Sequence, residues 1–212
     1  MDAVFSGIEN AVSEIKTNRA SDSRYDTVKE IHDYICQKAE YSAVMDQMPS
    51  ADSTDSSEEE KWDGDYLTSH LASPIFGGAG NNQIVCQGYA LAFKLLCNQF
   101  DIPCYVIYGD TPEEPHAWNA VQMDNGQWYG VDVTWDDSGD TADHTYFLCG
   151  RNTPIHPDGK GLFKEGHEND TFSDVHTPYS GIIWLPVEDQ SVTQLPAVLT
   201  FPQMAEEAYT PA

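Results

Sequence analysis

Apolar residues recur at helical spacing in two segments near the start of the chain. In residues 2–16 these positions are Val4, Ile8, Ala11, Val12 and Ile15, and in the next segment they are Val28, Ile31, Ile35 and Cys36. Positions three or four residues apart share one face of a helix, so each segment predicts an amphipathic helix. Ser21 or Ser23 can cap the second helix, which we expect to run to about Ala39.

The most apolar part of the chain begins at Cys86 and predicts a central helix. One face carries Tyr89, Ala92, Phe93, Leu96, Cys97 and Phe100, and Ala90, Leu91 and Leu95 make that face wider. A helix that is apolar almost all round is typically buried. Asp101-Ile102-Pro103 ends the helix, because proline cannot continue it.

Three strands are predicted after this helix. Residues 104–108, about 117–123 and about 127–134 have the β-branched and aromatic content of strands. The last two are joined by Asp124-Asn125-Gly126, which predicts a hairpin.

The length of the hairpin loop decides which side chains share a face. A two-residue Asn125-Gly126 turn would put His116 and Asp132 on opposite faces. A three-residue loop, with Gly126 in the left-handed conformation, would place Asp132 opposite Trp118 and diagonal to His116 on one face. If His116 and Asp132 act together, the loop must therefore have three residues.

Several other segments are predicted from local composition. Residues 46–65 are highly charged and predict an acidic surface loop, and residues 150–180 are rich in Gly, Pro, Asp and Asn and predict an irregular surface excursion. Residues 136–140 lack the spacing of a calcium loop and are interpreted as a solvated acidic turn. Additional strands are predicted at residues 144–149 and 182–185.

Length, composition and charge fit a single domain spanning residues 1–212. Hydrophobic residues make up 40% of the chain, which is enough for a full core. The formal net charge is −25, from 35 acidic and 10 basic side chains, so nucleic acids and anionic membrane surfaces would be repelled. No apolar run approaches membrane-spanning length, and we expect no membrane insertion. A protein partner with a basic face is compatible with this charge.

The start of the chain lacks the basic and apolar segments of a secretory signal. We expect an extracellular or cell-surface protein whose signal was removed before residue 1, because high acidic charge suits such a setting. A cytoplasmic location is the alternative.

The five cysteines are Cys36, Cys86, Cys97, Cys104 and Cys149, an odd number without a C-x-x-C pair. This pattern is typical of neither a disulfide framework nor a zinc knuckle. We expect no metal and no cofactor, since His156, His167 and His176 are also too far apart in sequence to specify a metal site.

Cys86, His116 and Asp132 are the candidate catalytic residues. Cys86 has polar, glycine-containing neighbours and begins a helix, where unpaired N–H groups and the helix dipole favour a thiolate. A nucleophilic thiolate needs a base or ion-pair partner, and an imidazole needs an acceptor that fixes its tautomer. From residue types alone, these three residues can form a catalytic triad or can occur in one chain without acting together.

The residues around these candidates resemble the three core motifs of the bacterial transglutaminase-like family. The matching segments are Val85-Cys86 with Gly88-Tyr89-Ala90, His116-Ala117-Trp118-Asn119, and Trp128-Tyr129-Gly130-Val131-Asp132-Val133-Thr134-Trp135-Asp136-Asp137. Ile31-His32-Asp33-Tyr34-Ile35, with Glu40-Tyr41, is similar to the helix that precedes them in the family. The motifs have the family's order and separations, and the resemblance covers about residues 20–150.

The resemblance implies an α+β, papain-like fold in which N-terminal helices and a central nucleophile helix pack on an antiparallel sheet. It also implies that Cys86 is the nucleophile, His116 the base and acid, and Asp132 the orienting carboxylate. Gln83 is a weak candidate for a second oxyanion donor, and Trp118 for a wall of the cleft.

The implied activity is cysteine-dependent acyl transfer from peptide or glutamine side-chain amides through a thioester. A protein or peptide substrate is expected, and hydrolysis is favoured over cross-linking. The alternative is a non-catalytic protein-binding or adhesion module that retains the fold.

Overall fold

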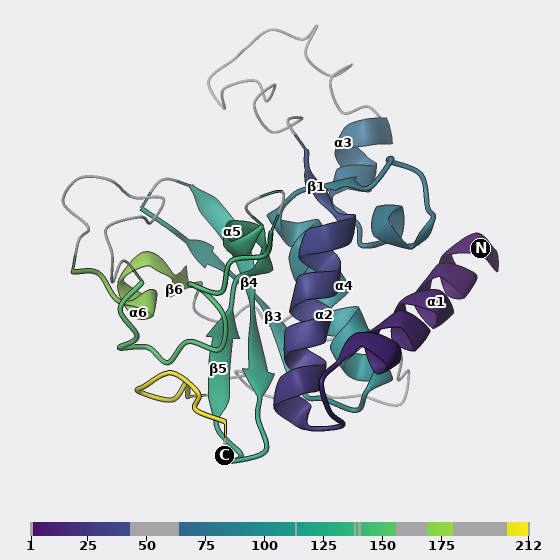
Figure 1. Ribbon diagram of the computed structural model, residues 1–212. Helices are drawn as coiled ribbons and strands as arrows, with labels where there is room; N and C mark the ends of the chain where they lie inside the picture. Colours follow the sequence, from purple (N-terminus) through teal and green to yellow (C-terminus); the bar gives the residue numbers. More distant parts are fainter. Residues whose placement is uncertain are drawn as a thin grey trace, which may run out of the picture.

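The computed structural model describes residues 2–42, 64–112, 114–137, 139, 141–155, 169–179 and 203–211. Helices gather on one side of a four-stranded antiparallel sheet, with shorter segments on its other side (Figure 1). This arrangement confirms the expected α+β class. Among the helices of these residues, none is long and apolar enough to span a membrane.

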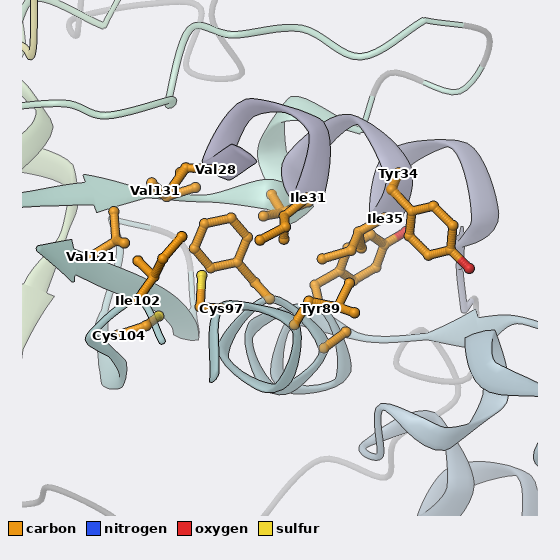
Figure 2. Packing of buried hydrophobic residues seen from close by; sticks show 14 of the residues in the cluster. Val28, Ile31, Tyr34, Ile35, Tyr89, Cys97, Ile102, Cys104, Val121 and Val131 are labelled. Atoms are coloured by element: carbon orange, nitrogen blue, oxygen red, sulfur yellow. The ribbon is translucent and has the colours of Figure 1, made fainter. Parts of the chain in front are cut away.

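The two amphipathic helices form as their patterns predict. They are α1 (Asp2–Asn18) and α2 (Arg24–Lys38). Ser23 caps α2, because its hydroxyl accepts a hydrogen bond from the Asp26 N–H at 3.0 Å. The apolar stripe of α2 is buried, and Figure 2 shows its Ile31 and Ile35 facing α4.

The central helix is α4 (Cys86–Gln99), which packs against α2 and against the sheet. Its Tyr89, Ala92, Phe93, Leu96 and Cys97 are each 0% exposed. Val121 and Val131 extend the same core onto the sheet (Figure 2). The predicted burial of this helix is therefore confirmed.

The start of α4 is held by a small second sheet and by a closely packed loop. β1 (Glu40–Tyr41) pairs in parallel with β2 (Gln83–Ile84), two residues before the helix. α3 (Gly64–Ser69) and η3 (Ser73–Phe76) lie between these two strands in the chain. A Cβ added at Gly88 would lie 2.8 Å from the Ser69 carbonyl oxygen, so only glycine allows this approach.

The main sheet has the strand order β5-β4-β3-β6. Its bounds are Cys104–Asp110 for β3, Pro115–Gln122 for β4, Trp128–Val131 for β5 and Thr177–Pro178 for β6. All three pairings are antiparallel.

The β4–β5 hairpin has the three-residue loop that cooperation between His116 and Asp132 requires. Asn119 pairs with Val131, and the Met123 N–H donates to the Gln127 carbonyl at 3.0 Å. Gly126 adopts a φ of 78°, the left-handed conformation expected of the loop. His116 and Asp132 therefore share one face of the hairpin.

Three local predictions were wrong. Residues 144–149 form no strand, since they pair only through an isolated Gly130–Cys149 bridge. Asp136 is not part of a solvated turn: it ends the short helix α5 (Val133–Asp136) and is 0% exposed. The excursion at 150–180 is not confined to the surface, because α6 (Phe172–Val175) buries Phe172 and Val175 against the sheet.

Two other predictions fall outside the described residues. These are the acidic loop, apart from the start of α3 at its end, and the strand at 182–185.

Candidate active site

Cys86 is the first residue of α4, directly after its N-cap Val85. Val85 has extended backbone and offers no side-chain cap, so the helix dipole and free N–H groups of the first turn point toward the region of Cys86. The side chain of Cys86 is half-buried, whereas the other four cysteines are buried. Cys86 is therefore the thiol that reagents can reach most easily.

His116 and Asp132 form a short, buried hydrogen bond. The Nε2 atom of His116 lies 2.6 Å from Oδ2 of Asp132, and the two residues are 5% and 0% exposed. Asp132 is also the N-cap of α5, where its Oδ1 accepts a hydrogen bond from the Trp135 N–H at 3.2 Å. The same carboxylate thus holds the imidazole and starts the following helix.

Electrostatic interactions favour the charged forms of both residues. Burial alone would lower the pKa of His116, but the Asp132 carboxylate and a hydrogen bond to Cys86 raise that pKa to about 10. Burial alone would raise the pKa of Asp132, but the imidazoles of His116 and His176 hold it well below its usual range. Because Nε2 faces Asp132, Nδ1 is the ring nitrogen left for Cys86.

A second histidine, His176, also contacts Asp132, a contact that the sequence did not predict. Its Nε2 lies 3.0 Å from the Asp132 Oδ2, and its Nδ1 lies 3.1 Å from the Phe172 carbonyl oxygen. A capping box between Thr171 and Asp174 starts α6, and His176 is the C-cap directly after its last residue, Val175. Burial lowers the pKa of His176, and Asp132 acts in the opposite direction. Nothing in the spacing of the histidines indicates this contact, which spans 44 residues.

Aromatic side chains enclose the two imidazoles. Trp135 stacks on His116 with ring centroids 4.8 Å apart, and Trp118 lies edge-on to His176 at 4.8 Å. Trp118 is only 1% exposed, and its role as a wall of the cleft stays a prediction. Gln83 lies on β2 with its side chain exposed, and its role as an oxyanion donor stays a prediction.

Neighbouring motif residues hold α4 against the sheet. The Asn119 Nδ2 donates to the Ala90 carbonyl at 3.0 Å, which joins β4 to α4. The Tyr89 hydroxyl donates to Asp137 at 2.6 Å, which joins α4 to the segment after Asp132. These two bonds set the position of Cys86 relative to His116 and Asp132.

Two groups among the described residues have the spacing of metal ligands. They are His116, Asp132 and His176, and His32, Asp33 and His144; in each group the ligand atoms lie within 4.8 Å of one another. In the first group all three residues are buried. In this group, the imidazoles of His116 and His176 both hydrogen-bond to Oδ2 of Asp132. This arrangement orients His116 for proton transfer through its other ring nitrogen, Nδ1.

The sequence model of the transglutaminase-like superfamily matches residues 11–133. Solved structures to which this chain is similar include a crystal structure of a TGase, with a TM-score of 0.45 and 21% identity over 66% of this chain and 32% of that one. Another is a proposed cysteine protease from Cytophaga hutchinsonii, with a TM-score of 0.39 and 20% identity over 62% of this chain and 37% of that one. The chain thus spans about a third of each structure's length. Comparison with curated proteins found no match. Because the family match covers more than half of the chain, the protein belongs to the transglutaminase-like superfamily and has its papain-like α+β fold.

Proposed function

We propose that this protein is a cysteine-dependent acyl-transfer enzyme that acts on peptide or glutamine side-chain amides. The proposal rests on the orientation and the raised pKa of His116. Asp132 holds its Nε2 at 2.6 Å, and a hydrogen bond to Cys86 contributes to its raised pKa. A thiol next to an oriented, easily protonated imidazole is the arrangement that nucleophilic catalysis by cysteine needs.

In the proposed acylation, Sγ of Cys86 attacks the amide carbon and forms a C–S bond while the carbonyl electron pair moves onto oxygen. The backbone N–H of Cys86 donates to this oxyanion, and a donor of this kind is worth about 3–4 kcal/mol in other enzymes. The C–N bond then breaks, and Nδ1 of His116 gives its proton to the departing amine. A thioester on Cys86 remains.

In the second half of the reaction, His116 takes a proton from the acceptor, which attacks the thioester. A C–O bond forms if the acceptor is water, and the C–S bond breaks with its electron pair going to Sγ. Cys86 is then again a thiolate beside the His116 imidazolium, which holds the proton taken from the acceptor. We propose hydrolysis as the main reaction, with a protein or peptide as substrate. A primary amine as acceptor would instead give a cross-link.

Alkylation by iodoacetamide tests the reactivity of Cys86. We expect Cys86 to react near neutral pH well before Cys36, Cys97 and Cys149, because burial raises the pKa of each of those thiols. His116→Ala should slow the reaction at Cys86 by about tenfold or more, since the imidazolium partner is lost. Peptide mapping by mass spectrometry would report each cysteine separately. Equal rates in the wild type and His116→Ala would contradict the proposal and favour a non-catalytic binding module.

The acceptor can be identified with a peptide library, with and without an added primary amine. Wild-type protein should form a transient mass adduct on Cys86, and Cys86→Ala should form none. Shortened or deamidated peptides would show hydrolysis, whereas amine-modified peptides would show cross-linking.

A further inference from the structure

A second polar cluster, formed by His32, Asp33 and His144, lies outside the site of Cys86. Nδ1 of His32 is 2.9 Å from Oδ1 of Asp33, and Nε2 of His144 is 2.7 Å from the same oxygen. The two imidazole rings lie 5.0 Å apart. His32 and Asp33 come from α2 and His144 from the segment after α5, so the cluster joins parts of the chain that are 111 residues apart.

His32 and Asp33 each have a second side-chain atom that faces away from the cluster and contacts another residue. Such contacts orient the side chains as metal ligands. Nε2 of His32 lies 3.1 Å from Oδ2 of Asp136, and both side chains are 0% exposed. A carboxylate on the outer nitrogen of a histidine is the usual partner of a metal-bound imidazole, because it fixes the tautomer and raises ligand basicity. Lys29 similarly holds the other oxygen of Asp33.

We propose that His32 Nδ1, Asp33 Oδ1 and His144 Nε2 bind a divalent metal ion of the zinc class. Two imidazole nitrogens and one carboxylate oxygen suit zinc and its transition-metal neighbours, whereas calcium and magnesium prefer oxygen ligands. The side chain of His144 is 36% exposed and that of Asp33 is 27% exposed, which leaves an entry path and room for water as a fourth ligand. On binding, the metal would take the place of the hydrogen bonds that the two imidazoles make with Asp33.

The bound metal would fasten the segment after α5 to α2. In that segment, Tyr146 donates its N–H to Asp136 at 2.9 Å and accepts a hydrogen bond from the Asp132 N–H at 3.1 Å. The segment is thus part of the frame around Asp132, although no ligand of the proposed site touches Cys86. The proposal is independent of the catalytic one.

Titration of the full chain with zinc tests the site. Cys86→Ala is used as the parent protein, so that zinc binding at the thiol of Cys86 is removed from the measurement. Calorimetry should show about one zinc ion per chain, and His144→Ala should weaken binding by about tenfold or more. Asp136→Asn, which replaces the carboxylate partner of His32 and keeps a side-chain oxygen that can accept the Tyr146 N–H, should weaken it by about 10- to 100-fold. His70→Ala serves as the control, because it removes an imidazole from outside the cluster.

Thermal unfolding provides a second measurement. Each variant is compared with itself, with zinc and with a chelator, so a change in stability caused by the substitution cancels. Zinc should raise the midpoint of the parent and of His70→Ala, relative to the same protein with a chelator, and should leave that of His144→Ala unchanged. Calcium and magnesium should shift none of them. Zinc binding of equal affinity in His144→Ala, or no binding by the parent at micromolar zinc, would overturn the proposal.

Discussion

Two imidazoles share one carboxylate oxygen at Asp132, and their pKa values move in opposite directions. Asp132 and Cys86 raise the pKa of His116 to about 10, whereas burial lowers that of His176. Asp132 and Cys86 both favour the positive charge on His116. A positive charge on the neighbouring His176 would be repelled by it. The geometry therefore favours one imidazolium, at the position next to Cys86.

The raised pKa of His116 predicts a pH dependence of stability. Between the unfolded value of 6.5 and the folded value of about 10, the folded protein binds the proton that the unfolded chain has lost. The contribution of His116 is therefore complete below pH 6.5 and falls as pH rises, by at most about 1.4 kcal/mol per pH unit. Urea unfolding of wild type and His116→Gln, at several pH values in this window, should show the difference between them shrink with pH.

His176→Gln provides a control of opposite sign. Because the pKa of His176 is lowered on folding, its contribution should be lost as pH falls below the unfolded value of 6.5. A difference between the wild type and His116→Gln that stays constant from about pH 6.5 to 10 would contradict the assignment of the charge to His116.

At the scale of elements, α4 begins with Cys86, the proposed nucleophile, and its first turn is positioned by close backbone contact. Gly88 is where α4 meets the carbonyl groups of Ser69 and Leu71, which a Cβ would approach to 2.8 and 2.9 Å. Backbone cannot move aside as a flexible side chain can. The glycine two residues after Cys86 therefore has a packing role as well as a place in the motif.

Gly88→Ala should lower both stability and the reactivity of Cys86. We expect a loss of about 1–3 kcal/mol in the free energy of unfolding, as for other overpacked sites. Iodoacetamide should also react more slowly with Cys86, because the start of α4 must shift. Gly126→Ala is the matched control: a Cβ there meets nothing within 4 Å, so only the positive φ costs stability and Cys86 should react as in the wild type. If both variants react like the wild type, Gly88 does not position the thiol.

Local signals were sufficient to predict the two N-terminal helices, the central helix and the hairpin, and to state the loop length that a pairing of His116 with Asp132 requires. The period-2 pattern of strands and the glycine of a three-residue loop together determine which side chains share a face, and both can be read along the chain. His176 and Asp136 could not be placed this way. Asp136 resembles a solvated residue locally, and its burial depends on His32, which lies 104 residues away.

At the scale of the whole molecule, the sheet is covered on both faces. One face packs against α2 and α4, and the other against Tyr146, Ile155 and Phe172. Ile155 and Phe172 belong to residues 150–180, whose Gly, Pro and Asp content is typical of surface loops, whereas Tyr146 belongs to residues 144–149, where a strand was predicted. For residues 150–180, composition predicted the irregular backbone and missed the burial, because burial depends on the surface that the sheet exposes to them.

The net charge of −25 predicts that salt stabilises this protein. Compact folding brings like charges together, and the screening length falls from about 30 Å at 0.01 M salt to about 8 Å at 0.15 M. The free energy of unfolding at pH 7 should therefore rise over this range, as measured by urea titration in sodium chloride. Near the isoelectric point of about 4.2 the same salt change should have little effect, because the net charge is close to zero. An equal rise in the free energy of unfolding at both pH values would contradict this explanation and indicate a general effect of salt on apolar burial. A fall at pH 7 would show that attractive ion pairs such as Lys38–Glu14 outweigh the repulsion.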